Sequence, residues 1–110
     1  LTVIMAFTTT EFREKNPKLT RAFIDALAEA TAFVDQNKAE AARIYTKYAK
    51  VKSQEEETLK IISDPDSKFT LTPYGVMTFA NFLSNVGAIK RKPAAWQDVF
   101  APEIHHLPGT

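Results

Sequence analysis

The feature that most constrains this chain is the run LTVIMAF at residues 1–7, which is almost wholly apolar. Its β-branched and aromatic side chains favour a strand, and because polar residues do not alternate with apolar ones, both faces of that strand should be covered. Such a strand needs neighbours, but only the segment FTLT at residues 69–72 also reads as extended. Two short strands make a marginal sheet. We therefore expect residues 1–7 to be a strand whose partner strands lie upstream.

The rest of the chain is predicted to be helical at about 11–48, 53–63 and 73–87, with a short helix and tail at 94–110. Thr10 is a candidate N-cap, Asn-Pro at residues 16–17 restarts the first helical stretch, and apolar residues then recur at helical spacing. A break at residues 35–37 precedes a second amphipathic helix, so these two helices are expected to form an αα-hairpin.

Capping signals define the later helices. Ser53 and Glu56 predict a capping box, Thr72-Pro73 repeats the cap-plus-proline start, and Gly87 stands where a left-handed C-terminal cap is expected. Aromatic residues on the helical stripes could line a partner groove, but their spacing favours a core. They are Phe23, Phe33, Tyr45, Tyr48, Phe79 and Phe82. The pattern predicts one domain over residues 1–110, mostly α-helical with one or two short strands.

Composition excludes several classes of function. With 14 Lys plus Arg against 13 Asp plus Glu and no long basic block, nucleic-acid binding is not expected. The absence of Cys excludes thiolate metal ligands and Cys nucleophiles. The chain contains no P-loop, dinucleotide fingerprint or nucleophile elbow. We therefore expect neither an enzyme nor a bound cofactor.

Four polar clusters are candidate sites. His105 and His106 are adjacent, which does not readily place both rings on one metal ion, so no metal site is expected. The EEE run at residues 55–57 suits a helix N-terminus, and the KRK run at residues 90–92 suits a solvated linker. Three hydroxyls follow the predicted strand and precede a helix, where α/β folds often hold anions. We take these as candidate ligand-binding residues, with helix capping as the alternative: Thr8, Thr9 and Thr10.

Four stretches, in this order, resemble a known family. They are residues 1–7 leading into EFREKNP at 11–17, the helix at 19–34, DQNKAEAARIY at 35–45, and WQDVFAPEIH at 96–105. Together they resemble the C-terminal portion of extracytoplasmic solute-binding proteins of ABC transporters. The family is the one that binds nitrate, sulfonates and taurine and that includes thiamine-precursor binders.

The resemblance implies a two-lobed α/β parent fold of the type II periplasmic binding proteins, which closes over a small anionic or heterocyclic solute and delivers it to an ABC permease. It also implies a periplasmic or extracytoplasmic location and no catalysis. Because a full member is about three times this length, the chain is expected to be a C-terminal fragment, with most solute contacts upstream. The alternative is a stand-alone helical protein-interaction module that forms a homodimer through its exposed N-terminal strand.

Overall fold

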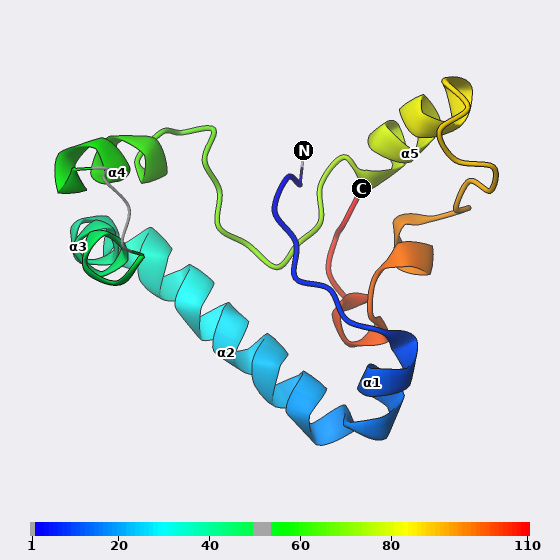
Figure 1. The fold of residues 1–110 in the computed structure, drawn as a ribbon, viewed down its shortest axis with the longest axis horizontal. Coiled ribbons are helices and arrows are strands. Elements are labelled where there is room, and N and C mark those ends of the chain that lie inside the picture. The colour runs from blue at the N-terminus through cyan, green and yellow to red at the C-terminus, as the bar shows by residue number, and fades with distance from the viewer. Residues whose placement is uncertain (1, 50–53) are drawn as a thin grey trace. The chain divides into compact units, whose positions relative to one another are not determined.

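The computed structural model describes residues 2–49 and 54–110, and every regular element in that part of the chain is helical (Figure 1). The prediction of a mostly α-helical chain is therefore confirmed. In chain order the elements are α1 (Thr10–Lys15), α2 (Pro17–Gln36), α3 (Lys38–Tyr48), α4 (Glu55–Ile62), α5 (Val76–Asn85) and the short 3-10 helices η1 (Trp96–Val99) and η2 (Pro102–Ile104).

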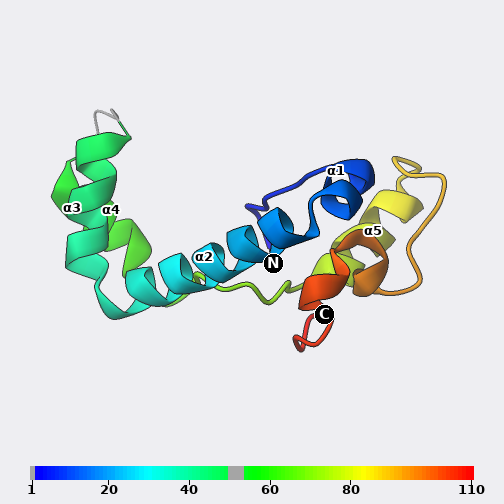
Figure 2. The same ribbon diagram turned by 90° about the horizontal axis from the view of Figure 1, so that it is seen from below.

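The chain divides into two compact units. The first contains Leu1–Arg21 and Leu71–Thr110, and the second is Ala22–Thr70. Helices α1 and α5 and the two 3-10 helices belong to the first unit, whereas α3 and α4 belong to the second. Helix α2 begins in the first unit and continues into the second, and its uninterrupted course is clearest in Figure 2.

The strands predicted at residues 1–7 and 69–72 are wrong for the described residues, which form no strand there. A strand is defined by a ladder of hydrogen bonds to a neighbour. At the start of the chain the described residues provide one such contact, from the Thr2 amide to the Tyr74 carbonyl at 2.8 Å, and the Tyr74 amide donates to Thr2 Oγ1 at 2.8 Å. Apolar β-prone residues without a partner strand therefore remain irregular backbone.

The predicted helical stretch 11–48 consists of three helices that are separated at Asn16 and Asn37. The restart at Asn-Pro is confirmed, since the Thr20 amide donates to the Asn16 carbonyl at 3.0 Å. The predicted αα-hairpin between α2 and α3 is wrong, because α3 packs against α4 instead. Ala42 of α3 is completely buried and Thr58 of α4 is nearly so, and these small side chains allow the two helices to approach closely.

Helix α4 corresponds to the helix predicted at 53–63. Ser53 lies outside the described residues, so the structure does not describe the predicted Ser53 capping box. Among the described residues, the Gln54 amide donates to Glu57 Oε2 at 3.4 Å, and the helix begins at Glu55.

Helix α5 starts later than predicted, at Val76, after Gly75 with a φ of 69°. The Thr72-Pro73 start is wrong because Pro73 is buried and its carbonyl accepts a 3.0 Å bond from the Thr110 amide. The predicted left-handed cap at Gly87 is confirmed by its φ of 74°. Its amide donates to Ser84 at 3.0 Å and the Ala88 amide donates to Leu83 at 2.8 Å, which together form a Schellman motif.

A small aromatic core holds the C-terminal tail. The Trp96 side chain is only 6% exposed, and its ring meets Phe100 and His105 edge-on at centroid distances of 5.9 and 5.8 Å. The imidazole Nε2 of His105 lies 2.9 Å from the Phe100 carbonyl oxygen. Gly109 lies so close to the indole that a Cβ there would be 2.7 Å from Trp96 Cε2. The short helix predicted within 94–110 is η1, which supplies Trp96 to this core.

Much apolar surface remains exposed. The chain exposes 8657 Å², whereas two separate globular domains of these sizes would together expose roughly 7,300 Å². Helix α2 contains no buried residue although it is clearly amphipathic. The aromatic residues predicted to form a core are all exposed, so that prediction is wrong: Phe23, Phe33, Tyr45, Tyr48, Phe79 and Phe82. An apolar stripe indicates that a face is suited to burial, but it does not identify what covers it.

Candidate functional site

The three threonines predicted as ligand-binding residues lie at the start of α1. Thr9 is the N-cap, with Oγ1 accepting from the Phe12 amide at 3.1 Å, and Thr10 is the first helical residue. The prediction of Thr10 as N-cap is therefore wrong by one position. Thr8, Thr9 and Thr10 are all exposed. The hydrogen bond that Thr9 accepts from the Phe12 amide is that of a helix cap.

An ion pair joins α1 to η2. Arg13 Nη1 lies 3.6 Å from Glu103 Oε1, and each side chain is 23% exposed. The second carboxylate oxygen of Glu103 is buried and has no hydrogen-bond partner within the described residues. Because the two residues are far apart in the sequence, no local pattern predicts their contact. Within its unit, the pair holds α1 against the C-terminal tail.

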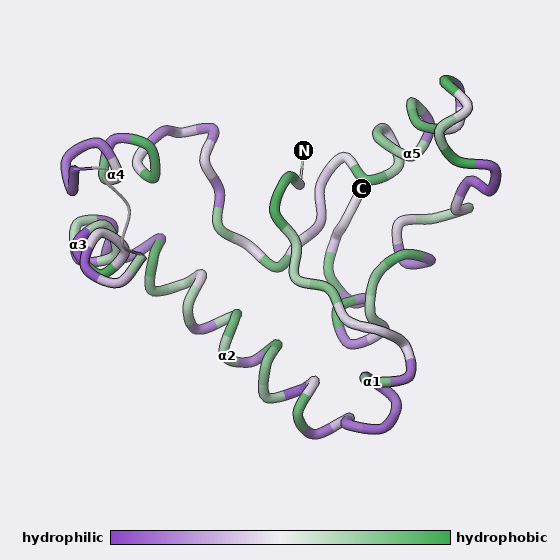
Figure 3. The backbone as a smooth tube through the Cα atoms, in the orientation of Figure 1, coloured by the Kyte–Doolittle hydropathy of each residue, from purple (hydrophilic) through white to green (hydrophobic). Residues whose placement is uncertain are grey.

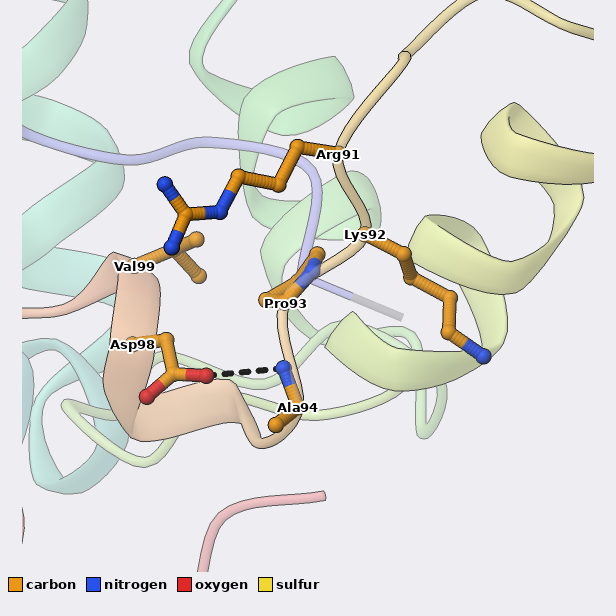
Figure 4. A pocket seen from close by; sticks show the side chains of 6 residues that line it. All are labelled: Arg91, Lys92, Pro93, Ala94, Asp98 and Val99. Carbon is orange, nitrogen blue, oxygen red and sulfur yellow. Dashed lines mark hydrogen bonds between the residues drawn. The ribbon is translucent and has the colours of Figure 1, made fainter.

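An open pocket lies between the basic linker and η1 (Figure 4). Asp98 Oδ2 accepts the Ala94 amide at 2.7 Å and the Ala95 amide at 3.1 Å. The pKa of Asp98 is lowered chiefly by the hydrogen bonds from the Ala95 and Ala94 amides; desolvation opposes this effect, and the positive charge of Arg91 makes a smaller contribution that lowers the pKa further. The pocket is lined by Arg91, Lys92, Pro93, Ala94, Asp98 and Val99.

In the predicted basic linker, the charged side chains of Arg91 and Lys92 point in different directions. In Figure 4 the Arg91 side chain extends over the pocket toward Val99, whereas Lys92 extends away from Asp98 toward α5. Lys92 Nζ donates to Asn81 Oδ1 of α5 at 3.0 Å. Both residues are exposed, as expected for a linker, but the position of Lys92 is fixed by a helix that the sequence pattern did not connect to it.

The other two clusters are the histidine pair at residues 105–106 and the acidic run at residues 55–57. His105 packs on Trp96, whereas His106 is exposed, so the adjacent rings have different environments. The acidic run forms the first turn of α4, as its sequence position predicts. Residues 2–49 and 54–110 contain no group of three or more His, Asp or Glu that could hold a metal ion. No helix within those residues has the length and hydropathy needed to cross a bilayer.

Residues 3–8 form a different kind of candidate site, an exposed apolar segment whose backbone makes no hydrogen bond to another described residue. Val3, Ile4 and Phe7 are 81%, 92% and 97% exposed, and Figure 3 shows the hydrophobic character of this part of the backbone. No backbone group of residues 3–8 is hydrogen-bonded to another described residue. In an extended conformation successive side chains point to opposite faces, so both faces would be apolar. The side chains of this segment therefore suit an inner strand of a sheet, but the described residues provide no neighbouring strand.

Comparison with known proteins yields no relative: no protein-family model, curated protein or solved structure matches the chain.

Proposed function

We propose that the chain is the C-terminal segment of the solute-binding component of an ABC importer. The observation that carries this proposal is the segment at residues 3–7. Its successive side chains are apolar, so both faces of an extended strand would be apolar, and its backbone groups have no hydrogen-bond partner among the described residues. A strand with those properties suits the interior of a parallel sheet that is covered on both sides. The two-lobed α/β parent fold implied by the sequence resemblance would supply such a sheet.

The exposed stripe of α2 gives further support. Phe23, Leu27 and Phe33 are all exposed on a helix that has no buried residue. Helices that cover a parallel sheet have an apolar stripe of this kind, which becomes buried only when the sheet is present. In the proposed parent protein, α2 and residues 3–7 would contribute to the same α/β layers.

The proposed cargo is a small anionic or heterocyclic solute, such as nitrate, a sulfonate, taurine or a thiamine precursor. The protein would bind this solute outside the cytoplasm and deliver it to an ABC permease, without catalysis. Thr8 and Thr10 would stand at the carboxyl end of the restored strand, where α/β folds place ligand contacts. The remaining cleft residues would come from the rest of the parent protein.

The test is a thermal-shift screen of the complete translated protein with nitrate, alkanesulfonates, taurine and pyrimidines, with chloride and acetate as control anions. A cognate solute at 100 times its Kd should stabilise the native state by about 2.7 kcal/mol. The proposal predicts a longer reading frame and a shift with one solute class only. A reading frame that starts at this segment, together with no selective shift, would contradict it.

The alternative is a stand-alone module that pairs with a second copy through residues 3–8. Its supporting observation is the unpaired backbone of that segment, because exposed strand edges recruit other strands. A two-stranded pair would leave both apolar faces in water, which makes this alternative the weaker one. Light scattering of the 110-residue chain tests this alternative, which predicts a concentration-dependent dimer and is contradicted by a monomer.

A further inference from the structure

Three segments that are far apart in the sequence are joined by hydrogen bonds just before α5 (Figure 1). They are the beginning of the chain, residues 73–76 and the C-terminal tail, and all three belong to the first compact unit. The Thr110 amide donates to the Pro73 carbonyl at 3.0 Å. The hydroxyl of Thr110 accepts the Gly75 amide at 3.0 Å, and its carbonyl accepts the Val76 amide at 2.7 Å. The tail is therefore fixed to the residues that lead into α5.

The beginning of the chain is fixed to the same short stretch. The Thr2 amide donates to the Tyr74 carbonyl at 2.8 Å, and the Tyr74 amide donates to Thr2 Oγ1 at 2.8 Å. Pro73 and Tyr74 thus bond to different segments, as successive residues of an inner strand bond to different neighbours. Within residues 2–8, Thr2 alone is hydrogen-bonded to another described residue, so these two bonds hold the start of the exposed apolar segment 3–8.

The backbone between the two attachments contains a glycine in a left-handed conformation. Gly75 has a φ of 69°, and the Thr110 hydroxyl bonds directly to its amide. Because glycine adopts many backbone conformations at little cost, loss of this bond would free the backbone next to Tyr74. Tyr74 and Thr110 are both exposed, and hydrogen bonds that water can reach open locally without unfolding of the whole unit.

We propose that the C-terminal tail is a latch for the apolar segment 3–8. While Thr110 holds residues 73–76 in place, Tyr74 holds Thr2, and release of the tail frees the start of the segment. The coupling is reciprocal, so that loss of the Thr2 bonds also loosens the tail. This proposal does not depend on the proposed function, because it uses no solute and no restored strand.

The experiment is amide hydrogen exchange of the full chain, followed by NMR. In Gly109→Ala, which displaces the tail, we expect the amides of Thr2, Tyr74 and Val76 to exchange at least about tenfold faster than in the wild type. The Arg13 amide, which donates to Thr9 in α1, should keep its rate. Wild-type rates at Thr2 and Tyr74 together with faster exchange at Val76 would overturn the proposal, as would equal acceleration at Arg13.

Milder variants test the coupling from both ends. Thr110→Val removes the hydroxyl that accepts the Gly75 amide, and it should speed exchange at Thr2. Thr2→Val removes the hydroxyl that accepts the Tyr74 amide, and it should speed exchange of the Thr110 amide. Thr8→Val is the matched control, because it makes the same replacement at an exposed residue outside the junction, and it should change neither rate. Equal rates of Thr110 exchange in Thr2→Val and Thr8→Val would overturn the proposal.

Discussion

Gly109→Ala tests whether the C-terminal tail is held by its close approach to Trp96. The new methyl carbon would lie 2.7 Å from Trp96 Cε2, 2.9 Å from Cδ2 and 3.0 Å from Cζ2. The indole is buried between Phe100 and His105, so it has little freedom to move away. The substitution should therefore displace the tail.

Displacement of the tail would also break the contacts of the next residue. The Thr110 carbonyl oxygen accepts the Val76 amide at 2.7 Å, and its hydroxyl accepts the Gly75 amide at 3.0 Å. Overpacking of a buried site costs about 1–3 kcal/mol, and each lost hydrogen bond contributes about 0.5–1.5 kcal/mol. We expect a total loss of about 2 kcal/mol from the free energy of unfolding, because partial relaxation preserves some of these contacts.

The assay is urea unfolding followed by tryptophan fluorescence. Trp96 is the only tryptophan in the chain, so its emission reports directly on this core. We expect Gly109→Ala to shift the native emission toward that of exposed indole and to lower the midpoint. Gly87→Ala is the control: a Cβ there meets nothing within 4 Å, and its φ of +74° should cost about 1 kcal/mol without changing the native emission. Unchanged stability and emission in Gly109→Ala would refute the steric argument.

Two further predictions concern the polar residues of the candidate sites. Thr9→Ala should lower the free energy of unfolding by about 1 kcal/mol through loss of the α1 cap, while Thr8→Ala should have little effect; equal effects in urea unfolding would contradict the capping role. The pKa of Asp98 is lowered in the folded state, so its charged form stabilises the fold above the unfolded pKa of about 3.9, and this contribution is lost as the pH falls through the lower folded value. Compared with Asp98→Asn, the wild-type chain should lose more stability as acid is added below about pH 4. Parallel pH profiles of the two proteins would contradict that assignment.

Local sequence signals predicted the helices well. Asn-Pro at residues 16–17, the break near Asn37 and the left-handed Gly87 act through backbone geometry and capping within a few residues, and all three features recur in the structure. The position of the cap at Thr9 instead of Thr10 is a shift of one residue, which is the usual precision of such boundaries.

Contacts between distant residues could not be predicted in the same way. Helix α3 packs against α4, with Ala42 and Thr58 buried, but periodicity does not identify which helix an apolar stripe will contact. The Arg13 to Glu103 ion pair has no local signal. The predicted strand failed for a related reason: residues 3–7 have suitable side chains, but a ladder requires a second strand that the described residues do not provide.

Amide hydrogen exchange at residues 3–7 tests the central claim most directly. The claim is the proposal that this segment is an inner strand of a larger solute-binding protein of which the chain would be a part. The measurement compares the 110-residue chain with the complete translated protein. We predict fast exchange in the chain, where these amides have no partner among the described residues, and strongly slowed exchange in the complete protein. Fast exchange in both forms, or protection already present in the chain alone, would contradict the account.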